Sequence, residues 1–146
     1  MYRLDDGDAD FKLVHFFPDF HSQIYFAYLG KKQNSEKSVQ KFKEKAIVSE
    51  KAIQEISEIS HAFINCKSIN EYNKLIVEHE MITGNVLNET PVKKALFNDF
   101  EGEIKSLGAW GGDFVMIASE LPIDRIRNYF LGKGIDIIFT FEEMLL

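Results

Sequence analysis

Cysteine and long apolar runs are scarce in this sequence of 146 residues. The single cysteine, Cys66, excludes an intrachain disulfide and reads as a small buried hydrophobic residue within a helix. The longest purely apolar run, residues 114–118, is far shorter than the roughly 20 residues that a membrane-spanning helix needs. The first residues are acidic and lack the apolar core of a secretory signal peptide. These observations predict a cytoplasmic protein that does not bind a membrane.

Positive charge is also in the minority. Seventeen basic and twenty-three acidic residues give a net charge of −6, which argues against nucleic acid as the main partner. Residues 31–45 are the exception, because six lysines there face only two glutamates, a local charge of +4. Two interpretations stay open for this segment: a docking surface for an anionic substrate, or a solvated helix face with extended lysines.

Two strands are predicted near the N-terminus, over residues 11–17 and 23–29. Both are rich in the aromatic and β-branched residues that favour strands. Residues 18–22 contain a proline and read as the turn between them, so we expect the two strands to pair antiparallel. Gly30 ends the second strand.

Three helices are predicted next, because apolar residues there recur every three or four positions. The first begins near Asn34 or Ser35, and Ser49 is a suitable cap for the second. Ser68 and Glu71 fit a capping box at the start of the third, in which each side chain bonds a backbone N–H of the first turn.

The pattern then returns to strands after a short helix that starts at Pro91. Strands are predicted over 103–107 and 113–119, followed by a helix over 122–133 and a last strand over 136–141. This order predicts an α+β fold, with a mostly antiparallel sheet and helices grouped on one side. Its C-terminal part resembles a ferredoxin-like unit.

The domain organisation follows from what the pattern lacks. No internal repeat and no low-complexity linker divides the sequence, so residues 1–146 are predicted to form one domain.

The most distinctive motif is the glycine-rich loop between the strands predicted at 103–107 and 113–119. The loop consists of Gly108, Ala109, Trp110, Gly111, Gly112 and Asp113. Its three glycines permit positive φ angles and close approach of a ligand, and successive N–H groups in such a loop can bind an anion. The alternative is a tight connection in which the glycines serve only the turn. The spacing fits neither a Walker A loop nor GxGxxG.

Other candidates for chemistry are weaker. His79 begins a near match to the HExxH zinc helix, but Thr83 stands where the second histidine is needed. His79 shares the apolar stripe of its helix, which predicts a core or boundary histidine. The one cysteine and four scattered histidines have no metal-ligand spacing, so no metal site is predicted. Cys66 and Ser106 lack the neighbours that activate a nucleophile, and no catalytic residue is named.

One resemblance to a known family arises at the glycine-rich loop. From Lys105 to Asp113 the sequence Lys-Ser-Leu-Gly-Ala-Trp-Gly-Gly-Asp resembles the third conserved motif of the GHMP kinase superfamily. That motif runs Lys, two residues, Gly-Ala-Gly and further glycines, and the ending Gly-Gly-Asp is similar to the phosphomevalonate kinase branch. Trp110 stands where the family usually has glycine, so its ring would narrow the loop or cover a ligand.

The resemblance extends to other segments of the chain. The strand that ends at Gly30, with Lys31–Ser35 opening a helix, is similar to the family segment that leads to a substrate-side helix. Residues 75–80 resemble the long helix before the C-terminal subdomain. The whole chain resembles the C-terminal half of mevalonate-kinase-like proteins, which implies a ferredoxin-like C-terminal GHMP kinase domain.

This resemblance implies a kinase that uses ATP and Mg²⁺ to phosphorylate a small alcohol or phosphorylated alcohol of the mevalonate type. The glycine-rich loop would border the phosphoryl-transfer site, and Lys31, Asn34 and Ser35 would face the substrate. The family's other phosphate-binding loop, similar to Gly-Leu-Gly-Ser-Ser-Ala, belongs to its N-terminal half and has no match here.

The lack of that second loop leads to further expectations. We expect this chain to need the N-terminal half as a partner, to be inactive and free of cofactor alone, and to self-associate through the uncovered surface. The alternative function is a non-catalytic α+β module for binding or oligomerisation.

Overall fold

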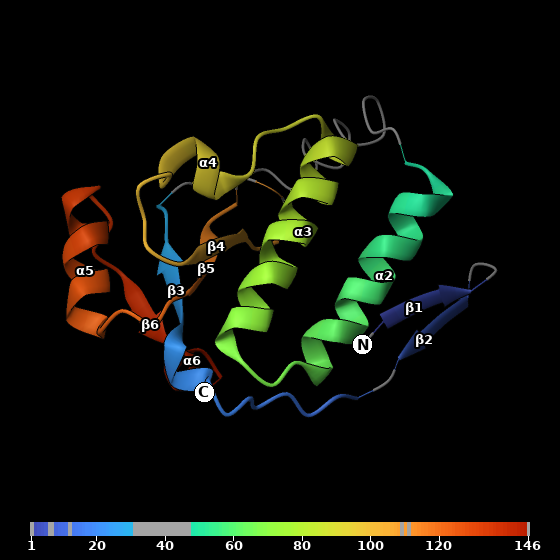
Figure 1. Cartoon of the computed structure of the whole chain (residues 1–146), viewed down its shortest axis with the longest axis horizontal. Helices are drawn as coiled ribbons and strands as arrows, with labels where there is room; N and C mark the ends of the chain where they lie inside the picture. The colour runs from blue at the N-terminus through green and yellow to red at the C-terminus, as the bar shows by residue number, and fades with distance from the viewer. Residues whose placement is uncertain are drawn as a thin grey trace.

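The computed structural model describes residues 2–5, 8–11, 13–30, 48–108, 110 and 112–145 (Figure 1). Strands and helices both contribute, and the predicted α+β fold with an antiparallel sheet is confirmed. In chain order the elements are β1 (Tyr2–Asp5), β2 (Asp8–Phe11), the 3₁₀ helix η1 (His21–Gln23), β3 (Ile24–Tyr28), α2 (Glu50–Asn65), α3 (Ile69–Leu87), α4 (Val92–Leu96), β4 (Glu103–Ser106), β5 (Phe114–Ala118), α5 (Ile123–Gly132), β6 (Ile138–Thr140) and α6 (Phe141–Met144).

The main sheet has four strands in the order β4-β5-β3-β6, and each neighbouring pair is antiparallel. The register pairs Tyr28 of β3 with Phe114 of β5, and Ser106 of β4 with Val115 of β5. The C-terminal ends of β3 and β4 therefore lie on either side of the start of β5. As a consequence, Gly30 and the glycine-rich loop are at the same end of the sheet.

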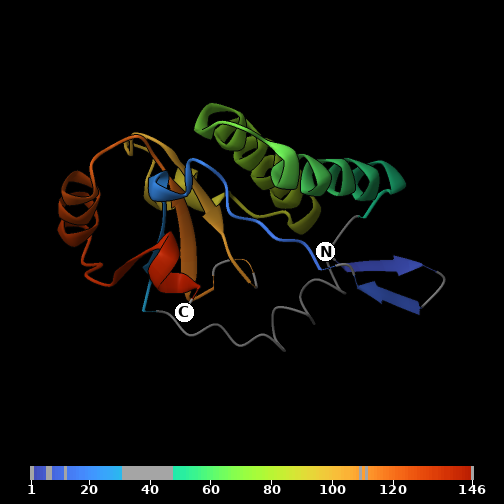
Figure 2. The ribbon, with the colours of Figure 1, turned by 90° about the horizontal axis from the view of Figure 1, so that it is seen from below.

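Helices cover both faces of this sheet (Figure 2). Val115 and Ile117 of β5 belong to one core cluster with Phe130 of α5, whereas Met116 belongs to a second cluster with Ile76 of α3. Successive residues of a strand point to opposite faces, and β5 is apolar on both. The prediction that the helices group on one side is therefore wrong, because a sheet that is apolar on both faces needs cover on both.

The predicted strand over residues 11–17 is also wrong. Residues 13–18 have no regular secondary structure, and β2 ends at Phe11. β3 has β5 and β6 on its two sides, so no edge of β3 is free to pair with the segment that precedes it. The aromatic residues of that segment pack elsewhere, and the Phe16 ring stacks on Tyr72 of α3 at 6.2 Å between centroids. β1 and β2, which the pattern did not indicate, form a separate antiparallel pair.

Two helix starts follow the predicted caps. The Ser49 side chain accepts a hydrogen bond from the Ala52 N–H at 3.1 Å, and α2 begins directly after it. Ser68 likewise accepts from the Glu71 N–H at 3.3 Å. The Glu71 carboxylate accepts from the N–H of Lys67 at 2.9 Å, one residue before the expected position. Both caps satisfy N–H groups that the helix itself leaves without partners.

The C-terminal elements also lie close to their predicted places. α4 begins at Val92, one residue after Pro91, and α5 buries Ile126 and Phe130. β6 is shorter than expected because Thr140 caps α6. The predicted helix that starts near residues 34–35 lies outside the described residues. In the part of the chain that the structure describes, no helix has the length and apolar character to cross a membrane.

Candidate functional site

The glycine-rich loop connects β4 to β5 at the end of the sheet where β3 terminates. At its base the Leu107 N–H donates to the Phe114 carbonyl at 3.2 Å, and the Leu29 N–H donates to the Asp113 carbonyl at 2.7 Å. Gly108 has a φ of +63°, and a Cβ built there would meet no atom within 4 Å. Backbone strain, about 1 kcal/mol for an L-residue, is thus the reason for glycine at this position.

The predicted site residues fall into two groups. Gly108, Trp110, Gly112 and Asp113 are described, with Gly108 exposed and Gly112 buried. The residues outside the described ranges are Ala109, Gly111, Lys31, Asn34 and Ser35. Gly30, the last described residue before these three, lies beside the loop, since the Leu29 N–H bonds the Asp113 carbonyl.

Trp110 turns its ring toward α3. Its Cη2 atom lies 3.1 Å from the position that a Cβ at Gly84 would occupy, and the Glu89 carbonyl oxygen lies 2.8 Å from the same point. No larger residue fits at position 84 without moving backbone. The indole Nε1 is buried and has no acceptor among the described residues. Among the described residues, packing against α3 rather than a hydrogen bond holds the ring.

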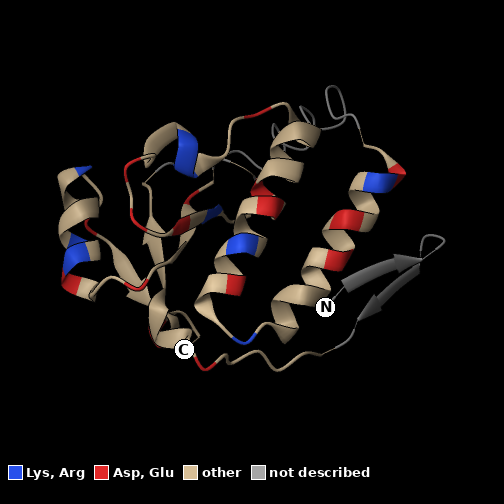
Figure 3. Ribbon diagram, viewed as in Figure 1, with Lys and Arg blue, Asp and Glu red and all other residues tan. Residues whose placement is uncertain are grey.

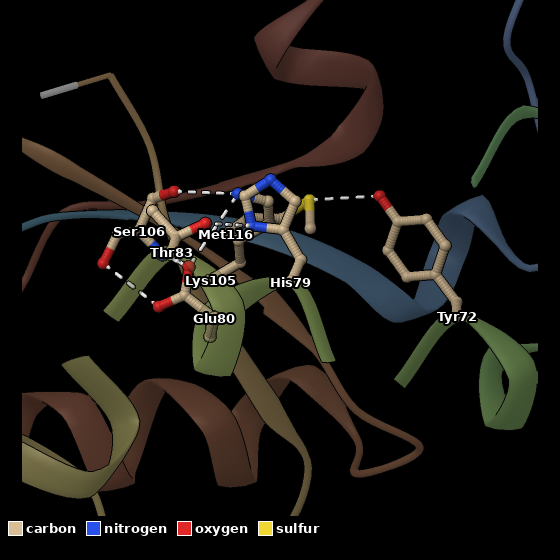
Figure 4. Close-up of polar contacts among 7 residues, drawn as sticks. All are labelled: Tyr72, His79, Glu80, Thr83, Lys105, Ser106 and Met116. Atoms are coloured by element: carbon tan, nitrogen blue, oxygen red, sulfur yellow. Dashed lines mark hydrogen bonds and ion pairs between the residues drawn. The ribbon is translucent and has the colours of Figure 1, made fainter. Parts of the chain in front are cut away.

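A buried carboxylate supports the strand that leads into the loop (Figure 4). Glu80 of α3 is 3% exposed. Its Oε1 accepts from the Ser106 backbone N–H and its Oε2 from the Ser106 hydroxyl, both at 3.3 Å. The Lys105 ammonium lies 3.8 Å from Oε1 and donates to the Ser106 carbonyl at 3.3 Å. These contacts fasten the end of β4 to the middle of α3.

The electrostatics of this cluster follow from its burial. Burial raises the pKa of the Glu80 carboxyl, while Lys105 and the Ser106 donors lower it in part. Burial also lowers the pKa of the Lys105 ammonium, which Glu80 opposes. Each charge therefore depends on the other, because neither has free access to water.

His79 occupies the position next to Glu80 on α3 and is half-buried, so the predicted core or boundary histidine is confirmed. Its Nδ1 lies 3.3 Å from the Thr83 hydroxyl. Burial lowers the pKa of His79 from 6.5 to about 4, and the nearby Lys105 charge contributes in the same direction. The imidazole is therefore neutral at pH 7, which excludes a permanent role as a cation.

The depressed pKa of His79 predicts a loss of stability in acid. The unfolded chain takes up the proton at pH 6.5 and the folded chain only near pH 4, so this contribution is complete above pH 6.5 and is lost on acidification. We expect a loss of about 1–2 kcal/mol, because partial exposure of the ring screens the charge. The measurement is urea unfolding of the wild type and His79→Gln from pH 7 to pH 4. Glu80 titrates in both proteins, so the difference isolates His79, and parallel pH profiles would contradict the expectation.

Glu80 is the residue that sequence reasoning missed. The predicted stripe of the third helix passed through His79, but the buried positions of α3 are Ile69, Tyr72, Ile76, Glu80 and Gly84. From Tyr72 onward these are four apart, so Glu80 continues the stripe by spacing although not by polarity. The sequence did contain one signal for Glu80: the helical period predicts burial at position 80, and a carboxylate is rarely buried without a partner.

The arrangement is suited to binding rather than to bond-breaking by its own groups. A loop with backbone N–H groups at a strand end can hold an anion. The Ser106 hydroxyl donates to the Glu80 carboxylate, and no histidine among the described residues bonds to it as a base. Within the described ranges, no three His, Cys, Asp or Glu side chains are placed to hold a metal ion. No protein-family model, curated protein or solved structure matches the chain, so the resemblance to GHMP kinases rests on its sequence motifs.

Proposed function

We propose that this chain is the C-terminal domain of a GHMP-type kinase that transfers phosphate from ATP to a small alcohol or phosphorylated alcohol. The observation that carries the proposal is the motif from Lys105 to Asp113, which forms the connection between two antiparallel strands. Backbone N–H groups of such a connection can approach phosphate oxygens closely where glycine leaves the path open.

The register of the sheet supports this proposal. β3 ends at Tyr28, and the Leu29 N–H bonds the Asp113 carbonyl, so Gly30, the residue before the lysine-rich segment 31–45, lies beside the glycine-rich loop. In the proposed enzyme, Lys31, Asn34 and Ser35 bind the anionic substrate there. A phosphoryl-transfer site needs positive charge and hydrogen-bond donors around the transferred group, and both kinds of group start from this end of the sheet.

The rigid base of the loop also supports a binding role. The Glu80 carboxylate accepts hydrogen bonds from the backbone N–H and the hydroxyl of Ser106. Lys105, which lies beside the same carboxylate, is the first residue of the motif. A loop must keep its donors in place to within a fraction of an ångström to favour a transition state. The buried cluster supplies that support from α3. ATP and Mg²⁺ would be held mainly by a second, N-terminal half.

The direct test compares this chain with a protein that also carries the N-terminal half. We expect the chain alone to show no phosphoryl transfer from Mg·ATP to mevalonate or phosphomevalonate, and the two-half protein to show it. Isothermal titration with Mg·ATP on both proteins measures nucleotide binding separately. Turnover by the chain alone, or an upstream half that neither contains a phosphate-binding loop nor binds ATP, would overturn the proposal.

Gly108→Ala tests the role of the loop in that two-half protein. Alanine at a φ of +63° strains the loop, and we expect kcat to fall about ten- to a hundredfold, as for a misplaced transition-state contact. The matched control is Gly134→Ala, at a φ of +81° and with equally open surroundings, between α5 and β6. Both changes should lower stability by about 1 kcal/mol. Equal kcat values for the two variants would contradict the role of the loop.

A groove between α2 and α3 favours the second candidate, a non-catalytic binding module. Its volume is about 420 Å³, and its rim includes Glu55, Glu58 and Glu78 around apolar side chains. Figure 3 marks acidic positions in red along both of these helices. Such a groove fits a basic amphipathic helix. Two results together would establish this alternative. A lysine-rich amphipathic peptide would bind the chain in a salt-sensitive way that Glu78→Lys abolishes, and the two-half protein would not bind ATP.

A further inference from the structure

A second cavity lies between α3, α4 and β4. Its volume is about 300 Å³, at the lower end of the range for small-molecule sites, about 300–1,000 Å³. Ile76 and Ile104 contribute to its lining and are 0% and 1% exposed. Met81 contributes from the rim and is 57% exposed. An apolar floor, with the exposed Met81 side chain at the rim, is suited to the body of a small ligand.

Most charged side chains that line this cavity already have a hydrogen-bond or ion-pair partner. Glu103 lies 2.8 Å from the Lys93 ammonium. Glu80 receives both donors of Ser106 and lies near Lys105. Each lining carboxylate is therefore already compensated.

Lys94 differs from these groups. It lines the same cavity and is exposed, and among the described residues no carboxylate lies within ion-pair distance of it. Asn98 adds a carboxamide that can donate a hydrogen bond at the same mouth. The uncompensated charge of the cavity is thus a single positive one, which complements one negative charge on a ligand.

We propose that this cavity binds a small amphipathic carboxylate, with its aliphatic or aromatic body on Ile76 and Ile104 and its carboxylate at Lys94. A monoanion fits better than a dianionic phosphate, because only Lys94 is uncompensated and two carboxylates are close by. The site is separate from the glycine-rich loop and does not depend on the proposed kinase function. Glu80 contacts both regions, since it lines the cavity and its carboxylate supports the strand before the loop.

The test titrates octanoate, octanol and octylamine into the chain and follows backbone amide signals by two-dimensional NMR. We expect saturable shifts at Met81, Lys94 and Ile104 with octanoate in the millimolar range or below. Octanol should bind the same residues more weakly, and octylamine weakest of all. An absence of saturable shifts with octanoate, or equal affinity for octanoate and octylamine, would overturn the proposal.

Three surface variants keep the test specific. Lys94→Gln should weaken octanoate about two- to fivefold, as the loss of one exposed ion pair predicts, and leave octanol unchanged. Val77→Trp, at a rim position that is 39% exposed, should fill the entrance and abolish the shifts. Lys67→Gln, at an exposed lysine two residues before α3 that does not line the cavity, is the matched control and should bind as the wild type does. Octanoate binding unaffected by Lys94→Gln and Val77→Trp would place the site elsewhere and refute this one.

Discussion

Lys105→Met is expected to lower the free energy of unfolding by about 3 kcal/mol near neutral pH, because it leaves a buried carboxylate without its cation. Glu80 is 3% exposed and already has a raised pKa. Without Lys105, the pKa of Glu80 in the folded state should rise further above 4.5, the ordinary value that it has in the unfolded chain. The deficit therefore shrinks as the pH falls toward that value and grows as the pH rises. Urea unfolding across this pH range measures it.

Two further variants separate the buried pair from general effects of losing a lysine. Lys51 forms an exposed ion pair with Glu55 at 3.4 Å, so Lys51→Met should cost less than about 0.5 kcal/mol. Adding Glu80→Gln to Lys105→Met should restore most of the stability, because the amide oxygen still accepts from the Ser106 N–H and no charge is buried. A double variant as unstable as Lys105→Met alone would show that packing, not charge, is what the lysine supplies.

Gly84→Ala has the second large expected effect, a loss of about 2 kcal/mol. Alanine is the better helix former by about 1 kcal/mol, but its Cβ would lie 2.8 Å from the Glu89 carbonyl oxygen and 3.1 Å from the Trp110 ring. Backbone and indole must both shift, and overpacking of this kind costs about 1–3 kcal/mol. Trp110 is the only tryptophan, so its fluorescence should report the displaced ring alongside the measured unfolding.

Gly132→Ala is the matched control for this helix position. Gly132 ends α5, and a Cβ there would meet no atom within 4 Å. The same substitution should therefore leave stability unchanged or raise it by up to about 1 kcal/mol, with no change in tryptophan fluorescence. Equal effects at positions 84 and 132 would show that the contact with Trp110 does not decide the outcome.

Helix starts were predictable because their determinants are local. A cap such as Ser49 or Ser68 bonds an N–H three residues away, so the sequence window contains the whole interaction. The strands on either side of the glycine-rich loop were predictable for a similar reason, since their connection is short. The strand over residues 11–17 failed because richness in aromatic and β-branched residues indicates a preference for strands, not a neighbouring strand with which to pair. Tertiary packing placed Phe16 on α3 instead.

The candidate site divides in the same way. The sequence by itself determined the glycine-rich loop, its family resemblance and the absence of a disulfide, since each depends on residue identity along a continuous stretch. Only the tertiary structure decided which groups meet there: Gly30 beside the loop, Trp110 over Gly84, and Glu80 beneath Ser106. Ser106 and Glu80 are 26 residues apart in sequence. Contacts over such separations depend on how the strands pair and how α3 crosses the sheet, which no local pattern of residues specifies.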